Sequence, residues 1–262
     1  MMAERRIAVS LLLLILLLFC TGVESVDDKK KSDDTLRSLL NQKGVSILHQ
    51  NVRGLLHNFT DIEQLLYTHK DIDIYTLSET HICAEEDNEK LYHVNGYNFE
   101  KRDRSNGRGG GVALYIRNSI NYIRRTDLES DTLENIVIEI VLKTSKNFFV
   151  TTLYNPPRSS KYSQSNFDEV FDESLKRFSS HEAILLGDLN VNFLKPSDNK
   201  AIKSMLFENG FTQIIKKPTR ITKDSKTLID IIATNRPSTI AASEVVPSSM
   251  QEKTKPSKVQ KL

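Results

Sequence analysis

An aspartate and an asparagine two residues apart, Asp188 and Asn190, are the residues of this chain best placed for chemistry. They follow the apolar run Ala183–Leu186 and Gly187, which predict a short buried strand and a turn at its end. Their period-two spacing sends both side chains to one face of the strand's C-terminal edge. A carboxylate and an amide presented together can hold a cation and a phosphate oxygen. The pattern also suits an ordinary turn, so it needs support from other segments.

Five separated segments place polar groups directly after an apolar strand, and the pair above lies in one of them. They are His49-Gln-Asn51-Val-Arg-Gly54, Leu77-Ser-Glu79-Thr80, Leu153-Tyr154-Asn-Pro-Pro157, Gly187-Asp188-Leu-Asn190 and Thr227-Leu-Ile-Asp230. Polar side chains gathered at strand ends around one rim suit a hard cation. Glu79 is the candidate direct ligand of Mg²⁺, with water and a substrate phosphate completing the coordination.

The elements that carry these segments mix strand pairs with helices, which indicates an α+β fold with helices covering sheet faces. Apolar alternation or short apolar runs predict strands at Val45–Asn51, Ile72–Leu77, Tyr97–Lys101, Gly111–Arg117, Ile136–Leu142, Phe148–Tyr154, Ala183–Asn190 and Leu228–Ala233. Helical periodicity predicts a helix that begins at Asp61 and two further helices at Asn166–Phe178 and Lys200–Glu208.

The N-terminus has the layout of a secretory signal. Arg5 and Arg6 precede the apolar stretch Ile7–Phe19, and the more polar Cys20–Ser25 follows, so cleavage is expected after Ser25. The alternative is a signal anchor, but this core is short for a hydrocarbon layer of ~30 Å. Cleavage would leave 262 − 25 = 237 residues, enough for one core. The expected product is extracellular, with no transmembrane anchor.

Composition restricts the partners and the redox chemistry. The net charge of +2 is too near neutral to favour strong nonspecific nucleic-acid binding. Cys20 would leave with the signal and Cys83 would remain alone, which excludes an intramolecular disulfide. Asn58-Phe-Thr60 is the only glycosylation sequon, so Asn58 is the expected glycan acceptor if the chain is exported.

Two charged segments bound the predicted domain, which covers residues 44–247. Residues 26–43 are rich in Asp and Lys and predict a charged linker, with a helical turn around Leu36–Leu40. Residues 248–262 are basic, polar and broken by proline, which predicts a disordered tail.

In their order along the chain, the motifs resemble those of the endonuclease/exonuclease/phosphatase superfamily, specifically the AP-endonuclease-like domain of LINE-type (non-LTR) retrotransposons. The resemblance covers Gly44 to Pro247. The matching segments are Ile47-Leu-His-Gln-Asn-Val-Arg-Gly54, Leu77-Ser-Glu-Thr80, Gly109-Gly-Gly-Val-Ala-Leu-Tyr115, Leu153-Tyr-Asn-Pro-Pro157, Leu185-Leu-Gly-Asp-Leu-Asn190, Pro218-Thr-Arg-Ile-Thr222 and Thr227-Leu-Ile-Asp-Ile-Ile-Ala-Thr-Asn235.

The resemblance implies a four-layer sandwich, two mixed β-sheets flanked by helices, that cuts phosphodiesters in nucleic acid with Mg²⁺. It implies that Glu79 is the metal ligand and that Asn51 supports it in the same pocket. Tyr154 would contact the scissile phosphate. As alternatives from the residues alone, Asn51 could cap a strand end and Tyr154 could pack at the rim.

The resemblance also assigns roles on the other side of the pocket. Asp188 would orient or deprotonate the attacking water, and Asn190 would hold the phosphate and stabilise its developing charge. Asp230 would pair with a catalytic histidine and favour its charged form, whereas its alternative role is to cap a strand end.

That histidine is where the chain departs from the family, which ends in a Ser-Asp-His motif on a final strand. No histidine follows His181, because Gln251 begins the unrelated tail. The last strand is therefore expected to be missing, and the rate is expected to fall by ~10²–10⁴. His81, two residues after Glu79, is a candidate to approach the metal; the alternative is a solvent-facing loop histidine.

Three functions remain open from the sequence. The favoured one is a secreted, catalytically impaired endonuclease-like domain with a non-enzymatic role among extracellular or matrix components. The second is a Mg²⁺-dependent phosphodiesterase or endonuclease with residual activity on nucleic acid. The third is a retrotransposon-derived gene fragment without function.

Overall fold

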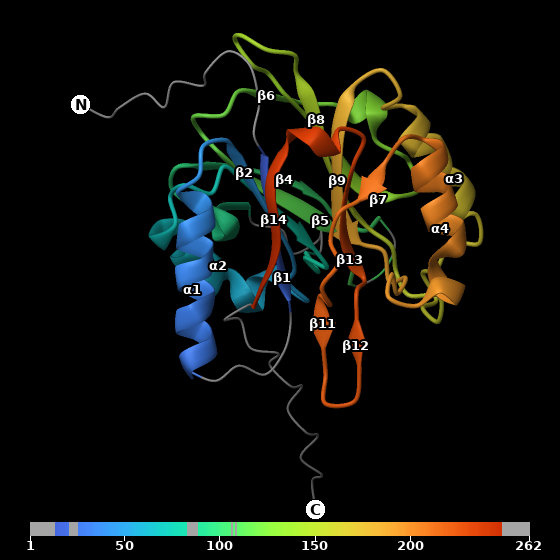
Figure 1. Ribbon diagram of the computed structural model, residues 1–262, viewed down its shortest axis with the longest axis horizontal. Coiled ribbons are helices and arrows are strands. Elements are labelled where there is room, and N and C mark those ends of the chain that lie inside the picture. Colours follow the sequence, from blue (N-terminus) through green and yellow to red (C-terminus); the bar gives the residue numbers. More distant parts are fainter. Residues whose placement is uncertain (1–13, 21–25, 83–88, 106, 108, 248–262) are drawn as a thin grey trace, which may run out of the picture.

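The computed structural model describes residues 14–20, 26–82, 89–105, 107 and 109–247 of the chain. Over these ranges two β-sheets stack face to face, and a pair of helices covers the outer face of each sheet (Figure 1). This arrangement of helices, sheet, sheet and helices is the four-layer α+β sandwich that the sequence predicts.

Each large sheet has six strands within the described ranges. The first sheet runs β14 (Ile240–Pro247), β1 (Leu14–Cys20), β2 (Val45–Asn51), β3 (Ile74–Ser78), β5 (Val112–Arg117), β4 (Tyr97–Arg102). The second sheet runs β10 (Thr212–Gln213), β13 (Asp230–Thr234), β9 (Glu182–Asp188), β8 (Phe148–Tyr154), β7 (Glu134–Ile140), β6 (Tyr122–Arg124). A separate hairpin joins β11 (Arg220–Ile221) to β12 (Lys226–Thr227) and projects from the body (Figure 1).

Four α-helices form the outer layers of the described structure. Beside the first sheet lie α1 (Val26–Leu40) and α2 (Leu55–Thr68), and beside the second lie α3 (Phe167–Lys176) and α4 (Pro196–Glu208). Among the described residues, short 3₁₀ turns lie in the loops at Glu89–Tyr92, Thr126–Leu128 and Pro237–Thr239. Within the ranges that the structure describes, no helix is long and apolar enough to cross a membrane.

Alternation along the strands of the first sheet divides the core into two clusters. In β2, Ile47 packs in the cluster between the sheets, whereas Leu48 packs in the cluster under α1 and α2. In β5, Leu114 and Tyr115 divide in the same way. Successive strand residues point to opposite faces, so both faces of this sheet are buried and its polar chemistry is confined to the strand ends.

Most predicted elements are present with small shifts at their ends, and β8 has the predicted bounds. The helix expected from Asp61 begins earlier, at Leu55, directly after Gly54. The helix expected from Lys200 begins at Pro196, where a first-turn proline costs no hydrogen bond. The strands β6, β10, β11, β12 and β14 are not among the predicted elements.

The N-terminal region differs most from expectation. Part of the apolar core of the predicted signal forms β1, an interior strand of the first sheet. Where the sequence predicts a charged linker with one helical turn around Leu36–Leu40, the structure has the longer helix α1, and its residues Leu36 and Leu40 are buried. The rest of the predicted signal, including Ser25, and the tail from residue 248 lie outside the described residues. The prediction of a missing last strand concerns that tail and stays a prediction.

Ion pairs join the two sheets along one edge. Arg124 of β6 contacts Glu100 of β4 at 3.0 Å, and Arg102 of β4 contacts Glu129 at 3.5 Å.

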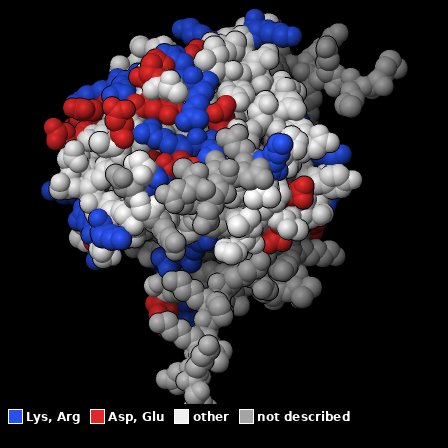
Figure 2. All heavy atoms as spheres, turned by 180° about the vertical axis from the view of Figure 1, so that it is seen from behind, with Lys and Arg blue, Asp and Glu red and all other residues white. Residues whose placement is uncertain are grey.

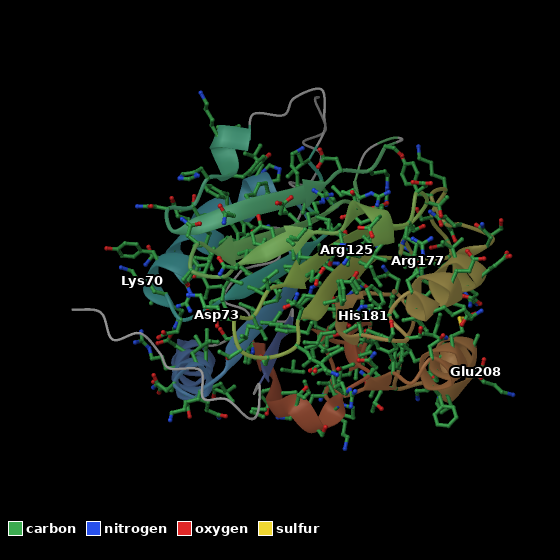
Figure 3. All side chains as sticks on the ribbon, turned by 90° about the horizontal axis from the view of Figure 1, so that it is seen from above. Lys70, Asp73, Arg125, Arg177, His181 and Glu208 are labelled. Carbon is green, nitrogen blue, oxygen red and sulfur yellow. The ribbon has the colours of Figure 1, made fainter. Side chains whose placement is uncertain are left out.

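On the back of the molecule, basic and acidic side chains are interspersed over one region (Figure 2). The end of the sandwich seen in Figure 3 carries Asp73 and His181, which lie just before β3 and β9.

Candidate active site

Two strands of the first sheet deliver the residues predicted to bind the metal. Asn51 is the last residue of β2, pairs in register with Ser78 of β3, and Glu79 follows directly. The Asn51 side chain donates from Nδ2 to Glu79 Oε1 at 2.7 Å and to Asp188 Oδ2 at 2.8 Å. Asp188 belongs to the second sheet, so Asn51 connects carboxylates from both sheets.

Three neighbouring strands of the second sheet deliver the remaining residues. Asp188 at the end of β9 pairs in register with Tyr154 of β8 on one side and with Asp230 of β13 on the other. All three are largely buried, with exposed fractions of 1%, 6% and 5% for Asp188, Tyr154 and Asp230. The structure thus brings together the sequence-predicted residues Asn51, Glu79, Tyr154, Asp188 and Asp230.

Gly187 has a different role from the predicted one. It lies inside β9 and its φ angle is not among the positive values of the chain's glycines. A Cβ built at Gly187 would collide with the carbonyl oxygen of Leu153 on β8. The absent side chain therefore permits the close approach of β8 and β9 that places Tyr154 beside Asp188.

Asn190 is held by its neighbours at the rim. Its backbone N–H donates to Asp188 Oδ1 at 2.7 Å, and its side-chain Nδ2 donates to the carbonyl of Asn155 at 2.8 Å. Asn155, a residue that the sequence did not single out, also donates from Nδ2 to the carbonyl of Leu189 at 3.0 Å. The loop after β8, which carries Asn155, and the loop after β9 therefore keep Asn190 close to Asp188.

The loops around these residues contain unfavourable backbone conformations. Over the described residues, the non-glycine positions with positive φ are Arg53, Glu79, His81 and Asn190, at 45°, 54°, 55° and 50°. All four lie in the loops after β2, β3 and β9. Such conformations cost of the order of 1–3 kcal/mol each and concentrate at functional sites. They support a functional role for this rim rather than a purely structural one.

Carboxylates crowded into a buried space dominate the electrostatics. Burial, together with the negative charge of Glu79, raises the pKa of Asp188 to about 6. Burial and the neighbouring Asp188 raise the pKa of Asp230 well above its usual value. Burial opposes ionisation of Glu79 as well, but hydrogen bonds from His81 and Asn51 outweigh it and lower the Glu79 pKa. Glu79 is therefore ionised at neutral pH, and it loses its proton at lower pH than Asp188 or Asp230.

Arginines that the sequence analysis did not identify lie close to these acids. The charge of Arg53 lowers the pKa values of Glu79, Asp188 and Asp230. Arg104 lies 5.9 Å above the ring of Tyr154 and pairs through Nε with Glu134 Oε1 at 2.6 Å. The one feature of the sequence that could have indicated Arg104 is its position just before the glycine-rich turn.

The glycine-rich turn supports the loop that carries Glu79. The carbonyl of Gly110 accepts the N–H of His81 at 2.8 Å, and the carbonyl of Gly111 accepts the N–H of Thr80 at 3.3 Å. Gly110 and Gly111 have φ of 69° and 83°, a region that suits glycine. The sequence predicted a turn here but not its contact with the site.

Two histidines, His81 and His49, lie near these acids in different environments. His81 lies at the surface of the site, with Nε2 at 3.3 Å from Glu79 Oε2 and 37% of its side chain exposed. His49 is fully buried on β2, and its Nε2 lies 3.9 Å from Asp230 Oδ1, beyond hydrogen-bond distance. Burial lowers the pKa of His49 to about 3, so this imidazole is neutral. Asp230 therefore faces a histidine in the structure, but one without access to solvent.

Asn58, the predicted glycan acceptor, lies in the first turns of α2 and is half-buried. Its Nδ2 donates to the carbonyls of Val52 and Gly54 at 2.8 and 3.1 Å. A glycan would replace one of the two hydrogens on this nitrogen, so in the folded domain at least one of these contacts would be lost. Glycosylation of Asn58 stays a prediction.

Among the described residues, no group of three or more His, Cys, Asp and Glu side chains has the geometry of a metal cluster. The predicted ligand set does not require one, because it consists of Glu79, supported by Asn51, with water and a substrate phosphate. Mg²⁺ is commonly bound by one or two carboxylates while it keeps several waters.

Comparison with known proteins identifies the class. Residues 48–250 match the model of the Endonuclease/Exonuclease/phosphatase family, and the chain belongs to this family. A search of curated proteins found no match.

Several solved structures are similar in fold. The endonuclease domain of TRAS1, a telomere-specific non-LTR retrotransposon, superposes with a TM-score of 0.54 at 16% identity, covering 71% of this chain and 83% of that one. An AP endonuclease from Archaeoglobus fulgidus gives 0.53 at 18% identity, covering 74% and 87%. The 3′ phosphatase NExo from Neisseria, bound to a product DNA hairpin, gives 0.50 at 14% identity, covering 72% and 85%. At these identities the likeness shows the fold.

Proposed function

We propose that this domain is a Mg²⁺-dependent phosphodiesterase that cleaves the backbone of nucleic acid at a low rate. One observation carries the proposal: Asn51 contacts Glu79 and Asp188 together, which places acids from both sheets in a single site. Family membership supports phosphoester chemistry. The DNA hairpin held by the Neisseria relative supports nucleic acid as the substrate class.

The residues present fit a hard cation. Glu79 offers an ionised carboxylate. Burial and the neighbouring negative charges raise the pKa values of Asp188 and Asp230 beside it, and a positive ion would relieve that repulsion. Members of this family generally depend on divalent metals. Glu79, supported by Asn51, would hold the ion, which when bound supplies positive charge to the phosphate oxygens.

The protein's own residues account for the remaining chemistry. Ionised Asp188 accepts a proton from the attacking water, and Asn190 beside it contacts the phosphate. Burial and the nearby charges of Glu79 and Asp188 raise the pKa of Tyr154, so its hydroxyl stays protonated and can donate to a phosphate oxygen. Arg53 and Arg104 supply the positive charge that attracts the anionic substrate.

The expected rate is low because Asp230 has no exposed histidine beside it in the described part of the chain. The imidazole nearest to it, His49, is buried and neutral, and so does not supply a charged acid to the substrate. Loss of a positioned acid typically costs ~10²–10⁴ in rate.

Nicking of supercoiled plasmid DNA in Mg²⁺ tests this proposal. The full chain should convert supercoiled to open-circular DNA slowly, and Glu79→Gln should abolish the conversion. Glu63→Gln is the matched control, because Glu63 is an exposed glutamate eight residues beyond the start of α2 at Leu55. Equal nicking by all three proteins would identify a contaminating nuclease and overturn the proposal, as would the absence of nicking in any divalent metal.

The signal-like N-terminus favours a second candidate, an exported domain with a non-enzymatic role among matrix components. Its support is that residues 1–25 run from a basic start through an apolar stretch to a more polar end, as in a secretory signal. Expression of the full chain with a C-terminal tag in secreting cells tests it. Recovery from the medium with a new N-terminus at Val26 supports export, and retention of the uncleaved chain inside the cell contradicts it.

A further inference from the structure

Strand β1 occupies an interior position in the first sheet. It lies between β14 and β2 and runs parallel to both. The register places Leu18 beside His49 of β2, and Cys20 beside Pro247 of β14. Both backbone edges of this strand are therefore occupied by neighbours.

The composition of the three strands suits these positions. The segment Leu14–Cys20 is apolar without alternation, which is typical of parallel strands inside a sheet covered on both faces. In β14, by contrast, Ala241 and Ser243 are exposed, as expected of an edge strand. In β2, residues 45–50 are all buried, as expected of an interior strand.

Helix α1 provides the connection that a parallel pair requires. Adjacent parallel strands need a crossover, usually a helix, and α1 lies between β1 and β2 in the chain. Its residues Leu36 and Leu40 pack in the same cluster as Val246 of β14. Asp33 Oδ1 lies 2.9 Å from Nε2 of His69 at the end of α2. The unit of β1, α1 and β2 is thus integrated with the rest of the outer layer.

Without β1 the strand β14 would have no partner in the sheet. Neighbouring strands lie ~4.8 Å apart, so removal of β1 would leave β14 and β2 separated by about two spacings, too far for backbone hydrogen bonds. Two open edges would face this gap. An unpaired edge is a template for added strands and for aggregation.

We infer that the slot between β2 and β14 is a strand-binding site whose occupant is Leu14–Cys20 of the same chain. The folded domain therefore retains the segment that resembles the core of a signal. Cleavage after Ser25 would separate β1 from the domain, so export with cleavage and completion of the first sheet are alternative fates of one segment. This inference does not depend on the proposed catalytic activity.

Disulfide trapping in the full chain tests the register. On a Cys83→Ser background, Pro247→Cys places a thiol beside native Cys20, at a strand spacing within the range of Cα separations that disulfides span. Ala241→Cys is the matched control on the same strand, six residues from that position and roughly 20 Å away. Mild oxidation should link Cys20 to residue 247 and leave residue 241 free. Equal linkage at both positions would overturn the inference.

Hydrogen exchange of the unaltered full chain gives a second readout that needs no disulfide. The amides of Leu14–Cys20 should be protected to the same degree as those of β2. Fast exchange over Leu14–Cys20 beside a protected β2 would overturn the inference even if trapping failed for geometric reasons. Leu16→Pro, which removes a backbone donor in the middle of β1, should lower the thermal midpoint more than Leu16→Val.

Discussion

Asn51 and Asp188 are 137 positions apart in the chain, yet Asn51 Nδ2 lies 2.8 Å from Asp188 Oδ2. The contact joins the end of β2 in one sheet to the end of β9 in the other. Because the same amide also binds Glu79, it fixes the separation of two acids that would otherwise repel each other. The site is thus assembled at the junction of the sheets, and it depends on how they dock.

Asn51→Ala should slow nicking by a larger factor than its loss of folding stability explains. The change leaves Glu79 and Asp188 without a shared donor, and a lost partner for a charged group costs about 1–3 kcal/mol. Nicking rates and urea midpoints of the wild type and the variant check this. A variant with wild-type nicking would show that Asn51 only caps the end of β2.

Asp188→Asn should reduce the nicking rate by ~10²–10⁴, because the amide cannot accept a proton from water. In the wild type the pKa of Asp188 is about 6, so the rate should rise with pH as this carboxyl ionises. A bound cation lowers this pKa, which places the midpoint of the rise at about 6 or below. A pH profile with its midpoint above neutrality would exclude Asp188 as the base.

His49 should make the folded state less stable as the pH falls. Its folded pKa of about 3 lies below the unfolded value of about 6.5, so between these values the unfolded chain binds the additional proton. The stabilisation that comes from keeping His49 neutral is therefore complete above pH 6.5 and is lost toward pH 3. Between these values the free energy of unfolding falls with a limiting slope of about 1.4 kcal/mol per pH unit.

Urea titrations of the wild type and His49→Gln at pH 7, 6 and 5 measure this dependence. The stability difference between the two proteins should move in favour of the variant as the pH falls. The raised pKa of Asp230 acts in the opposite direction in both proteins, so the comparison isolates the histidine. Parallel profiles for both proteins would contradict the assignment.

Gly187→Ala should destabilise the domain and slow nicking. The added methyl group collides with the carbonyl of Leu153, and overpacking of this kind costs typically about 1–3 kcal/mol. The strand must shift, and with it Asp188. Thermal unfolding and nicking are the measurements, with the exposed Ala241→Gly as the control. A fully stable and active variant would show that β8 and β9 need no close contact.

The layers of the fold were predictable because apolar periodicity is local. Strands such as β8 and the apolar face of α3 follow from residues within one element. The polar ends of strands indicated Asn51, Glu79, Tyr154, Asp188 and Asp230, since each directly follows an apolar run or lies near its end.

Features that depend on distant partners were not predictable. Arg104 meets Tyr154 only once the sheets dock, and the approach of His49 to Asp230 requires the same docking. Leu14–Cys20 has the same apolar composition whether it acts in a signal or as an interior strand, so composition alone could not reveal β1. In α1 the sequence indicated only the turn around Leu36–Leu40, the buried part of the helix, because the charged residues before it carry no apolar periodicity.

The face-to-face stacking of the sheets also has a kinetic consequence. Residues that must meet at the site come from opposite ends of the domain, and contacts of such long sequence separation form slowly because loop-closure entropy opposes them. No functional pocket exists until the two sheets have docked. During refolding, recovery of nicking should therefore lag behind recovery of secondary structure.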